Sequence, residues 1–293
     1  MSCTRTHTVV TGASSGIGRA TALRLAGAGH HVYAGVRRDA DGESLRQAAG
    51  SGELTPLRLD VTSADQLAAA ADLVAGHVGP AGLDGLVNNA GIGVSAPLES
   101  ISVDTLRRQF DVNVFGQVAV TQAFLPLLRR APGRIVVIGS IGNRLAIPFG
   151  GALAASKRAV SSLADSLRLE LAAWNIRVVL LEPASIHTEA VDKMRHETDD
   201  VLAALPADQR ELYADSYRAM MDTALARERA GSPPAVVAAA VLTALTSARP
   251  RAHYLVGKDA RLLATVARLP TPLLDAVRRR IFRLPAPGSR AVR

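Results

Sequence analysis

The stretch that decides the fold is "HTVVTGASSGIGRA", residues 7–20. It begins as an apolar run of strand length, passes through a turn rich in glycine and serine, and ends in a helical pattern. Gly12 permits a tight turn, Gly16 lets the backbone approach a ligand closely, and Gly18 allows a helix to pack against a strand. A turn of this kind, at the start of a helix, presents free backbone N–H groups to phosphate. The glycine spacing differs from G-x-G-x-x-G, and a P-loop is excluded because no Gly-Lys-Ser/Thr follows.

Outward from this stretch, apolar runs of strand length alternate with helical patterns. Most of the runs are continuously apolar, as is typical of parallel strands covered on both faces. Strands alternating with helices predict an α/β fold, with one Rossmann-type doubly wound parallel sheet of about seven strands in three α/β/α layers. No repeat or linker divides the sequence, so we expect one domain over residues 1–293. The predicted strands are 7–12, 30–37, 54–61, 83–91, 133–140, 176–183 and 252–257, and the predicted helices lie near 16–28, 63–78, 103–130, 153–174 and 233–248.

Two segments fall outside this alternation. Residues 189–231 are polar and helix-prone and lie between the last two predicted strands. Ligands of open α/β sheets bind beyond the carboxyl ends of the strands, so this insertion is expected to form a substrate lid. Residues 259–293 form a basic, amphipathic tail broken at Pro270 and Pro272. Packing onto the domain or a second subunit is the simpler interpretation of the tail, and weak contact with an acidic membrane surface is the alternative.

The composition indicates a globular protein, with 48% hydrophobic and 20% charged residues. Six of the charges that make up the net +8 are arginines after Asp275, so the rest of the chain carries only about +2. With 3% aromatic residues and no spread basic face, nucleic-acid binding is not expected. The single cysteine, Cys3, fits a reducing compartment. No apolar leader precedes the first strand, and the longest apolar segment, 235–248, is shorter than the roughly 20 residues of a spanning helix, so we expect a cytoplasmic protein.

Further motifs stand at the ends of the later predicted strands. They are "LVNNAG" (86–91), "DVNVFG" (111–116), "IGS" (138–140) with Lys157 downstream, and "EPASIHT" (182–188). Together with residues 11–20, they make the chain resemble the classical short-chain dehydrogenase/reductase family over nearly its whole length. "PFGGALAASK" (148–157), "EPASIHT" and the extended tail are most similar to the 17β-hydroxysteroid and retinol dehydrogenase-like branch. The resemblance implies a dinucleotide-binding domain, a lipophilic alcohol or ketone as substrate, and a homodimer or homotetramer paired through the helices at 103–130 and 153–174.

The end of the second strand indicates the cofactor. NAD-preferring members typically carry an acid there, whereas this chain has Arg37 and Arg38. Guanidinium groups pair with a 2′-phosphate that a carboxylate would repel, so we expect NADP(H). Asp39 and Asp41 come slightly too late and suit a loop or a helix start. The resemblance further assigns cofactor contacts to Gly12, Ser14, Ser15, Gly16, Ile17, Gly18, Asp60, Val61, Asn89, Ala90, Gly91, Lys157, Pro183, Ile186 and Thr188.

One position departs from the family pattern. The catalytic set of the resembled family is Asn, Ser, Tyr and Lys, with the tyrosine four residues before the lysine. Asn113, Ser140 and Lys157 match this set, but Leu153 occupies the tyrosine position. The tyrosine supplies a proton to the alkoxide formed by carbonyl reduction, and a positioned acid is worth about 10²–10⁴ in rate. Leucine has no proton to give.

Other proton donors and other functions therefore stay open. Ser140 can polarise an oxygen but is a weak acid, Tyr213 and Tyr217 of the lid could reach inward, and His187 suits a structural role. The seven histidines are scattered, so no metal site is expected. Three functions fit: a reductase that uses water, Ser140 or a lid residue as donor; a non-redox cyclase, isomerase or dehydratase that keeps NADP(H); and a non-catalytic nucleotide-binding partner subunit.

Overall fold

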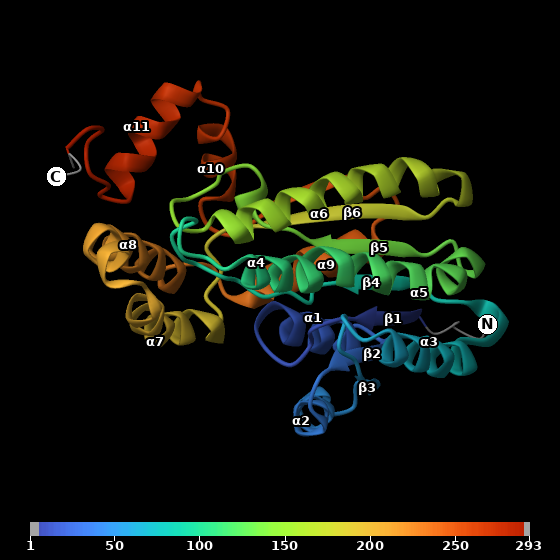
Figure 1. The fold of residues 1–293 in the computed structure, drawn as a ribbon. Helices are drawn as coiled ribbons and strands as arrows, with labels where there is room; N and C mark the ends of the chain where they lie inside the picture. Colours follow the sequence, from blue (N-terminus) through green and yellow to red (C-terminus); the bar gives the residue numbers. More distant parts are fainter. Residues whose placement is uncertain (1–5, 290–293) are drawn as a thin grey trace.

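A single seven-stranded parallel sheet forms the centre of the molecule (Figure 1). The computed structural model describes residues 6–289, without the side chains of residues 190–197. The strand order is β3-β2-β1-β4-β5-β6-β7, so the order reverses between β1 and β4 and opens a crevice at the carboxyl ends of those two strands. This confirms the predicted Rossmann-type sheet and all seven predicted strands. The strands are β1 Thr6–Val10, β2 His30–Val36, β3 Leu54–Arg58, β4 Gly85–Asn88, β5 Arg134–Ile138, β6 Arg177–Pro183 and β7 His253–Val256.

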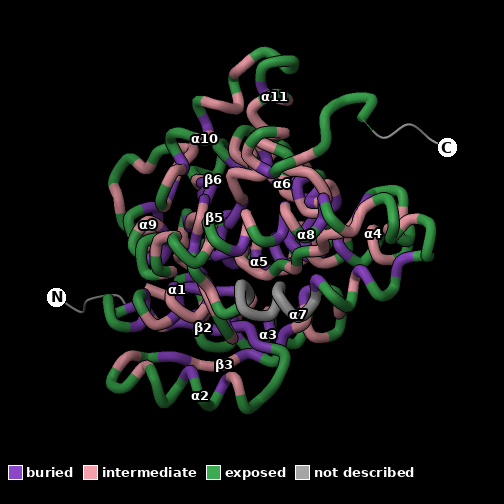
Figure 2. The backbone as a smooth tube through the Cα atoms, turned by 90° about the vertical axis from the view of Figure 1, so that its left-hand side faces the viewer, coloured by how far each residue is buried: buried purple, intermediate pink, exposed green. Residues whose placement is uncertain are grey.

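Helices cover both faces of the sheet, and each face has its own apolar core. On one face, Val10, Val32 and Val136 of the strands pack with residues of α1 and α9 such as Leu25 and Val241. On the other face, the strands pack against α3, α5 and α6. Figure 2 shows buried residues along the strands and mostly exposed ones along α2. The flanking helices are α1 Gly16–Gly27, α2 Asp39–Ala49, α3 Ala64–Val78, α4 Val103–Phe110, α5 Gly116–Arg130, α6 Gly151–Glu170 and α9 Pro234–Thr246.

The predicted long helix at 103–130 is not continuous. A π-helical turn, Asp111–Phe115, separates α4 from α5. Asn113 lies in this turn with its side chain fully buried, and its amide bonds both the N–H and the carbonyl of Ile92, at 2.8 and 2.9 Å. A π-turn widens a helix by one residue and is common at functional sites, so the interruption sets Asn113 against the loop that follows β4.

The insertion and the tail lie at the end of the sheet where the strands terminate (Figure 1). The insertion forms α7 Glu189–Ala204 and α8 Ala207–Arg229, and the tail forms α10 Ala260–Val266 and α11 Thr271–Ile281. α8 shares a small core with the residue that follows α11, because Tyr217, Met220 and Met221 pack with Phe282. The described part of the tail thus packs onto the domain, while Cys3, Arg290 and Arg293 lie outside the described residues. Within residues 6–289, none of the helices has the length and apolar character needed to cross a bilayer.

Candidate active site

The glycine-rich turn between β1 and α1 forms a cradle that leaves no room for a side chain at Gly12 or Gly18. Gly12 has φ +63°, and a methyl group there would lie 2.8 Å from the Cα of Ala90. A methyl group on Gly18 would lie 2.1 Å from the carbonyl oxygen of Gly12. Ser15 caps α1 without a side-chain hydrogen bond to any described residue, and the first turn of α1 holds no acid. The helix start therefore presents free N–H groups and a positive dipole end, which fits a pyrophosphate.

A cleft of about 780 Å³ extends from this cradle along the carboxyl ends of β1, β2 and β4. Its walls are formed mostly by residues that the sequence assigned to the cofactor. These are Gly12, Ser14, Ser15, Gly16, Ile17, Gly18, Arg37, Asp60, Val61, Asn89, Ala90, Gly91 and Thr188. The size and the mixture of backbone and polar side chains fit a dinucleotide. Arg38, Lys157, Pro183 and Ile186 do not line this cleft.

The two arginines after β2 are placed differently. Arg37 lines the cleft, is exposed, and its positive charge contributes to lowering the pKa of Asp60. Arg38 instead forms a two-point ion pair with Asp41, with Nε and a terminal nitrogen at 2.9 and 2.8 Å from the two carboxylate oxygens. Because its guanidinium is already engaged at the start of α2, Arg38 is a poorer candidate than Arg37 for contact with a 2′-phosphate.

One end of the cleft is formed by the residues after β3. Asp60 accepts hydrogen bonds from the hydroxyl and the backbone N–H of Thr62, at 2.6 and 2.9 Å. These bonds, in that order, hold the pKa of Asp60 below its usual value against the opposing effect of burial. The carboxylate of Asp60 is thus hydrogen-bonded within its own loop. Val61, the next residue, contributes an apolar side chain to the wall of the cleft.

The loop after β6 closes the opposite side of the cradle. A methyl group on Gly16 would lie 3.3 Å from Cγ2 of Thr188, so this loop reaches across to the phosphate turn. Asn89 joins β4 to the same turn, because its amide donates to the carbonyls of Thr11 and Gly12 at 2.9 and 3.0 Å. Pro183 ends β6, and Ile186 is buried and pairs with Ser232. Neither Pro183 nor Ile186 lines the cleft.

The predicted catalytic residues converge where β4 and β5 end. A methyl group on Gly91 would lie 3.2 Å from Oδ1 of Asn113 and 3.8 Å from Nζ of Lys157, so these three residues meet. Nζ of Lys157 donates to the carbonyl of Ile138 at 2.8 Å. The lysine residue is partly exposed, but its ammonium lies deep among protein atoms, and this desolvation lowers the pKa of Lys157 to about 8.

Ser140 lies two residues after the end of β5 and caps a short 3₁₀ turn, Ile141–Asn143. Its Oγ accepts a hydrogen bond from the backbone N–H of Gly142 at 3.0 Å. No described residue accepts the proton of this hydroxyl. Ser140 can therefore donate a hydrogen bond to a ligand oxygen while its own lone pair is held by the turn.

Leu153 lies in the first turn of α6 and is partly exposed. Its Cδ2 would lie 3.6 Å from a methyl group on Gly93, so the side chain faces the loop after β4. The leucine makes this part of the site apolar. It presents no group that could exchange a proton with Lys157, one turn further along the helix.

Two tyrosines of α8 bond the loop after β4. The hydroxyl of Tyr213 donates to Glu99 at 2.5 Å, and that of Tyr217 donates to the carbonyl of Ser95 at 2.9 Å. Both hydroxyls thus tie α8 to residues 95–99. His187 is exposed, and its backbone N–H donates to the carbonyl of Ser232 at 3.0 Å.

Several residues of the cleft were not predicted from the sequence. Phe115 is 61% exposed although it belongs to a helix next to the core. Arg108 and Asp111 approach the cleft from α4 and the π-turn. An aromatic residue two positions after Asn113 was the available signal for Phe115. No sequence signal pointed to Arg108, because its position depends on the π-turn at residues 111–115.

A second cavity of about 630 Å³ lies between the loop at residues 146–149, α8 and the tail. Its lining is largely apolar and includes Ile147, Phe149, Leu212 and Leu284. Arg278 and Arg279 stand at its edge, and Arg278 is paired with Asp275 at 3.1 Å. α8 and the tail thus flank an open, largely apolar hollow next to the loop that leads into α6.

Comparisons with known proteins agree with one another. The family model described as short chain dehydrogenase matches residues 6–199. The chain is 36% identical over 285 residues to 17-beta-hydroxysteroid dehydrogenase type 6 of Bos taurus, which covers 94% of this chain and 89% of the relative. It is 34% identical over 277 residues to retinol dehydrogenase 16 of Mus musculus, which covers 92% and 87%.

Two solved structures extend these matches. A short-chain dehydrogenase from Streptomyces avermitilis has a TM-score of 0.74 and 28% identity, and the match covers 97% of both chains. An alcohol dehydrogenase from the archaeon Thermococcus sibiricus, complexed with 5-hydroxy-NADP, has a TM-score of 0.57 and 30% identity, covering 62% of this chain and 77% of that chain.

Proposed function

This chain belongs to the short-chain dehydrogenase/reductase family of oxidoreductases, on the side of the retinol and 17β-hydroxysteroid dehydrogenases, and we propose that it uses NADP(H) to interconvert a lipophilic alcohol and ketone. The observation that carries the proposal is the meeting of Gly91, Asn113 and Lys157 next to a cleft that fits a dinucleotide. Family membership gives a nicotinamide cofactor. The choice of NADP(H), the substrate class and the working of the site without a tyrosine are our proposals.

Arg37 supports the choice of NADP(H). It is the residue after β2 that lines the cleft, and no acid precedes it there. A guanidinium at this position attracts a 2′-phosphate. The Thermococcus sibiricus relative, whose structure contains 5-hydroxy-NADP, is consistent with this choice.

The residues of the site act on the carbonyl and its proton as follows. When bound, the nicotinamide supplies or accepts the hydride. Ser140 donates a hydrogen bond to the substrate oxygen, because its hydroxyl proton has no acceptor in the described part of the chain. Lys157 holds a positive charge below its pKa of about 8 and stabilises negative charge near that oxygen. With Leu153 in place of the acid, the proton comes from bound water or from Ser140, at a cost of about 10²–10⁴ in rate.

The apolar surroundings support a lipophilic substrate. Leu153 faces the loop after β4, and the second cavity next to residues 146–149 is lined mostly by apolar side chains. We assign residues 189–231 as the substrate lid of a single domain over residues 1–293, with α8 closing over this space. The two named relatives act on retinol and on 17β-hydroxysteroids according to their names, which agrees with this substrate class.

A non-redox function is the second candidate, and Leu153 favours it. A site that holds the cofactor, Asn113, Ser140 and Lys157 but lacks the acid is also suited to cyclisation, isomerisation or dehydration. A non-catalytic NADP(H)-binding partner subunit would need only the cofactor contacts. Both differ from the main proposal in showing no turnover of NADPH with any carbonyl.

We also propose a homodimer or homotetramer and a cytoplasmic protein with weak membrane-surface contact through its tail. Exposed apolar residues on α6 and just after it support assembly, since Leu169 is 70% and Trp174 48% exposed. Arg278, Arg279 and Arg280 end α11 and support attraction to an acidic surface.

The test of the proposed function is NADPH oxidation measured against a panel of lipophilic ketones, with cofactor binding measured in parallel. Slow but saturable oxidation with one class of ketone supports the proposal. Tight NADPH binding without oxidation on any ketone contradicts it and favours the second candidate.

A further inference from the structure

A fully buried acid lies behind the predicted catalytic residues. Glu182 is the penultimate residue of β6, and its exposure is 0%. Burying a carboxylate is costly unless it is paired and hydrogen-bonded. Apart from Arg177 at its start, the strand "RVVLLEP" is otherwise apolar, so a specific set of partners must hold this charge.

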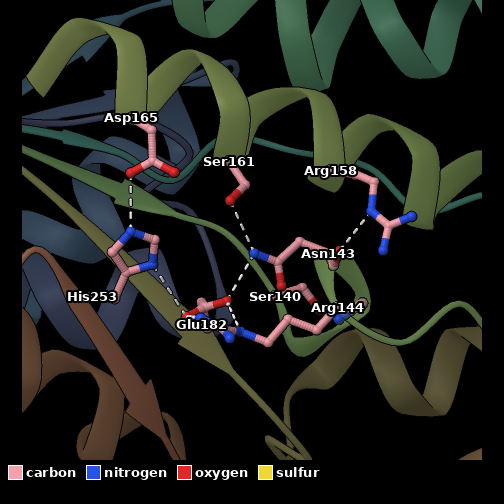
Figure 3. Close-up of polar contacts among 9 residues, drawn as sticks. Ser140, Asn143, Arg144, Arg158, Ser161, Asp165, Glu182 and His253 are labelled. Atoms are coloured by element: carbon pink, nitrogen blue, oxygen red, sulfur yellow. Dashed lines mark hydrogen bonds and ion pairs between the residues drawn. The ribbon is translucent and has the colours of Figure 1, made fainter. Parts of the chain in front are cut away.

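The partners of Glu182 come mainly from the turn that begins at Ser140 (Figure 3). Arg144 donates through Nε to Oε1 at 2.6 Å and through a terminal nitrogen to Oε2 at 2.8 Å. Asn143 donates through Nδ2 to Oε1 at 2.8 Å. Burial acts to raise the pKa of Glu182, but the bonds from Arg144 and Asn143 outweigh it and hold this pKa below its usual value. The group is therefore a paired carboxylate at neutral pH.

The same turn is also bound to α6, the helix that carries Lys157. Asn143 donates to the hydroxyl of Ser161 at 3.1 Å, and its backbone carbonyl accepts from Nε of Arg158 at 2.9 Å. Arg158 and Ser161 lie one and four residues beyond Lys157. Glu182 thus joins four elements: its own β6, the turn that follows Ser140, α6 through Asn143, and β7 through Nδ1 of His253 at 3.5 Å.

We propose that Glu182 is a positioning residue that acts through Arg144 and Asn143 to fix the hydroxyl of Ser140 relative to Lys157. Neither Glu182 nor Arg144 lines the cofactor cleft, so the effect must pass through the turn. The inference rests on the proposed function, in which Ser140 donates to the substrate oxygen. Because Leu153 supplies no hydroxyl, the placement of Ser140 carries more of the chemistry than it would beside a tyrosine.

The kinetic test uses Glu182→Gln and the ketone that the natural chain reduces best. The amide nitrogen of glutamine faces a donor of Arg144, so one arm of the two-point pair is lost at constant volume. Reactive groups displaced by about 1 Å can cost on the order of 10² in rate, so we expect kcat to fall 10- to 100-fold by this estimate. The Kd for NADPH should stay within about twofold, because cofactor contacts lie elsewhere.

A double-mutant cycle separates positioning from general weakening of the fold. In a Ser140→Ala background, Glu182→Gln should cause no further loss of kcat, since the group that it positions is gone. Asp84→Asn is the matched control, because Asp84 is a half-buried carboxylate that bonds the backbone N–H of His7 at the other end of the sheet. It should leave kcat unchanged. All rates are taken well below the melting temperature of each variant.

A second readout does not depend on turnover. Cys3 is the single cysteine, so a Cys3→Ser, Ser140→Cys chain carries one thiol at the turn. Adding Glu182→Gln should raise the rate of thiol modification at least fivefold, whereas adding Asp84→Asn should not. If the natural chain reduces no ketone, the proposed function fails, and the thiol rate alone decides whether Glu182 holds the turn. The proposal is overturned by an unchanged thiol rate, or by a loss of kcat on Glu182→Gln that is as large in the Ser140→Ala background.

Discussion

Replacing Arg37 by alanine removes a guanidinium from the part of the cleft where we propose that the 2′-phosphate binds. The side chain is exposed and lines the cleft, and it forms no ion pair or hydrogen bond with another of the described residues. Its neighbour Arg38 is 78% exposed and bound to Asp41 by two hydrogen bonds. The two arginines therefore form a natural pair of test and control variants.

The expected magnitude follows from exposure. A hydrogen bond to a charged group contributes about 1.5–3 kcal/mol. Because Arg37 is exposed to solvent, we expect its bond to the 2′-phosphate to contribute an amount at the lower end of this range. About 1.4 kcal/mol is a factor of ten in Kd. Arg37→Ala should thus weaken NADPH about tenfold and leave NADH nearly unchanged, because NADH lacks the 2′-phosphate. Arg37→Asp should reverse the preference.

Isothermal titration of both cofactors measures this directly for the natural chain, Arg37→Ala and Arg38→Ala. The natural chain should bind NADPH at least tenfold tighter than NADH, and added salt should reduce that preference by screening. The reasoning is refuted if Arg38→Ala weakens NADPH as much as Arg37→Ala does. Equal loss of NADH and NADPH on Arg37→Ala would also refute it, since the contact would then not involve the phosphate.

Three other predictions follow from the site and the surface. Desolvation lowers the pKa of Lys157 to about 8, so its ammonium is present below that pH and lost above it. We therefore expect kcat/KM for ketone reduction to fall above about pH 8, and a kcat/KM that stays constant up to pH 9.5 contradicts this role of Lys157. Gly18→Ala should abolish cofactor binding in titration, because its methyl group would lie 2.1 Å from the Gly12 carbonyl, whereas Gly27→Ala meets nothing within 4 Å and should bind normally. Light scattering at micromolar concentration should give a dimer or tetramer, and a monomer would contradict the assembly proposed from exposed residues such as Trp174.

Much of the fold could be predicted because its signals are local. Continuous apolar runs identified all seven strands, and the glycine turn identified the cradle. α2 was not among the predicted helices, because "DADGESLRQAA" is polar and contains Gly42. That glycine is required by tertiary packing, since a methyl group on it would lie 2.7 Å from Cβ of Pro56. Asp39 is the first residue of α2, which agrees with the expectation that it lies in a loop or at a helix start.

The part of the site that could not be predicted depends on contacts distant in sequence. The spacing of Arg38 and Asp41 was a usable signal for their ion pair. Only the structure shows that Arg37 lines the cleft whereas Arg38 is held by Asp41. The π-turn at Asn113 depends on its bonds to Ile92, 21 residues away. Glu182 was available as an acid inside an apolar strand, but its partner Arg144 lies 38 residues earlier in a loop that no periodic pattern describes.

The most direct test of the central claim is the rate of NADPH-dependent ketone reduction by Leu153→Tyr compared with the natural chain. A tyrosine at this position shares a helix face with Lys157, four residues on, and would restore the missing acid. We expect the rate to rise on the order of 10²-fold, given the usual contribution of a positioned acid. If the natural chain already reduces ketones at an ordinary rate of about 10 s⁻¹ and the tyrosine changes nothing, another proton donor is present and this account of the site is wrong.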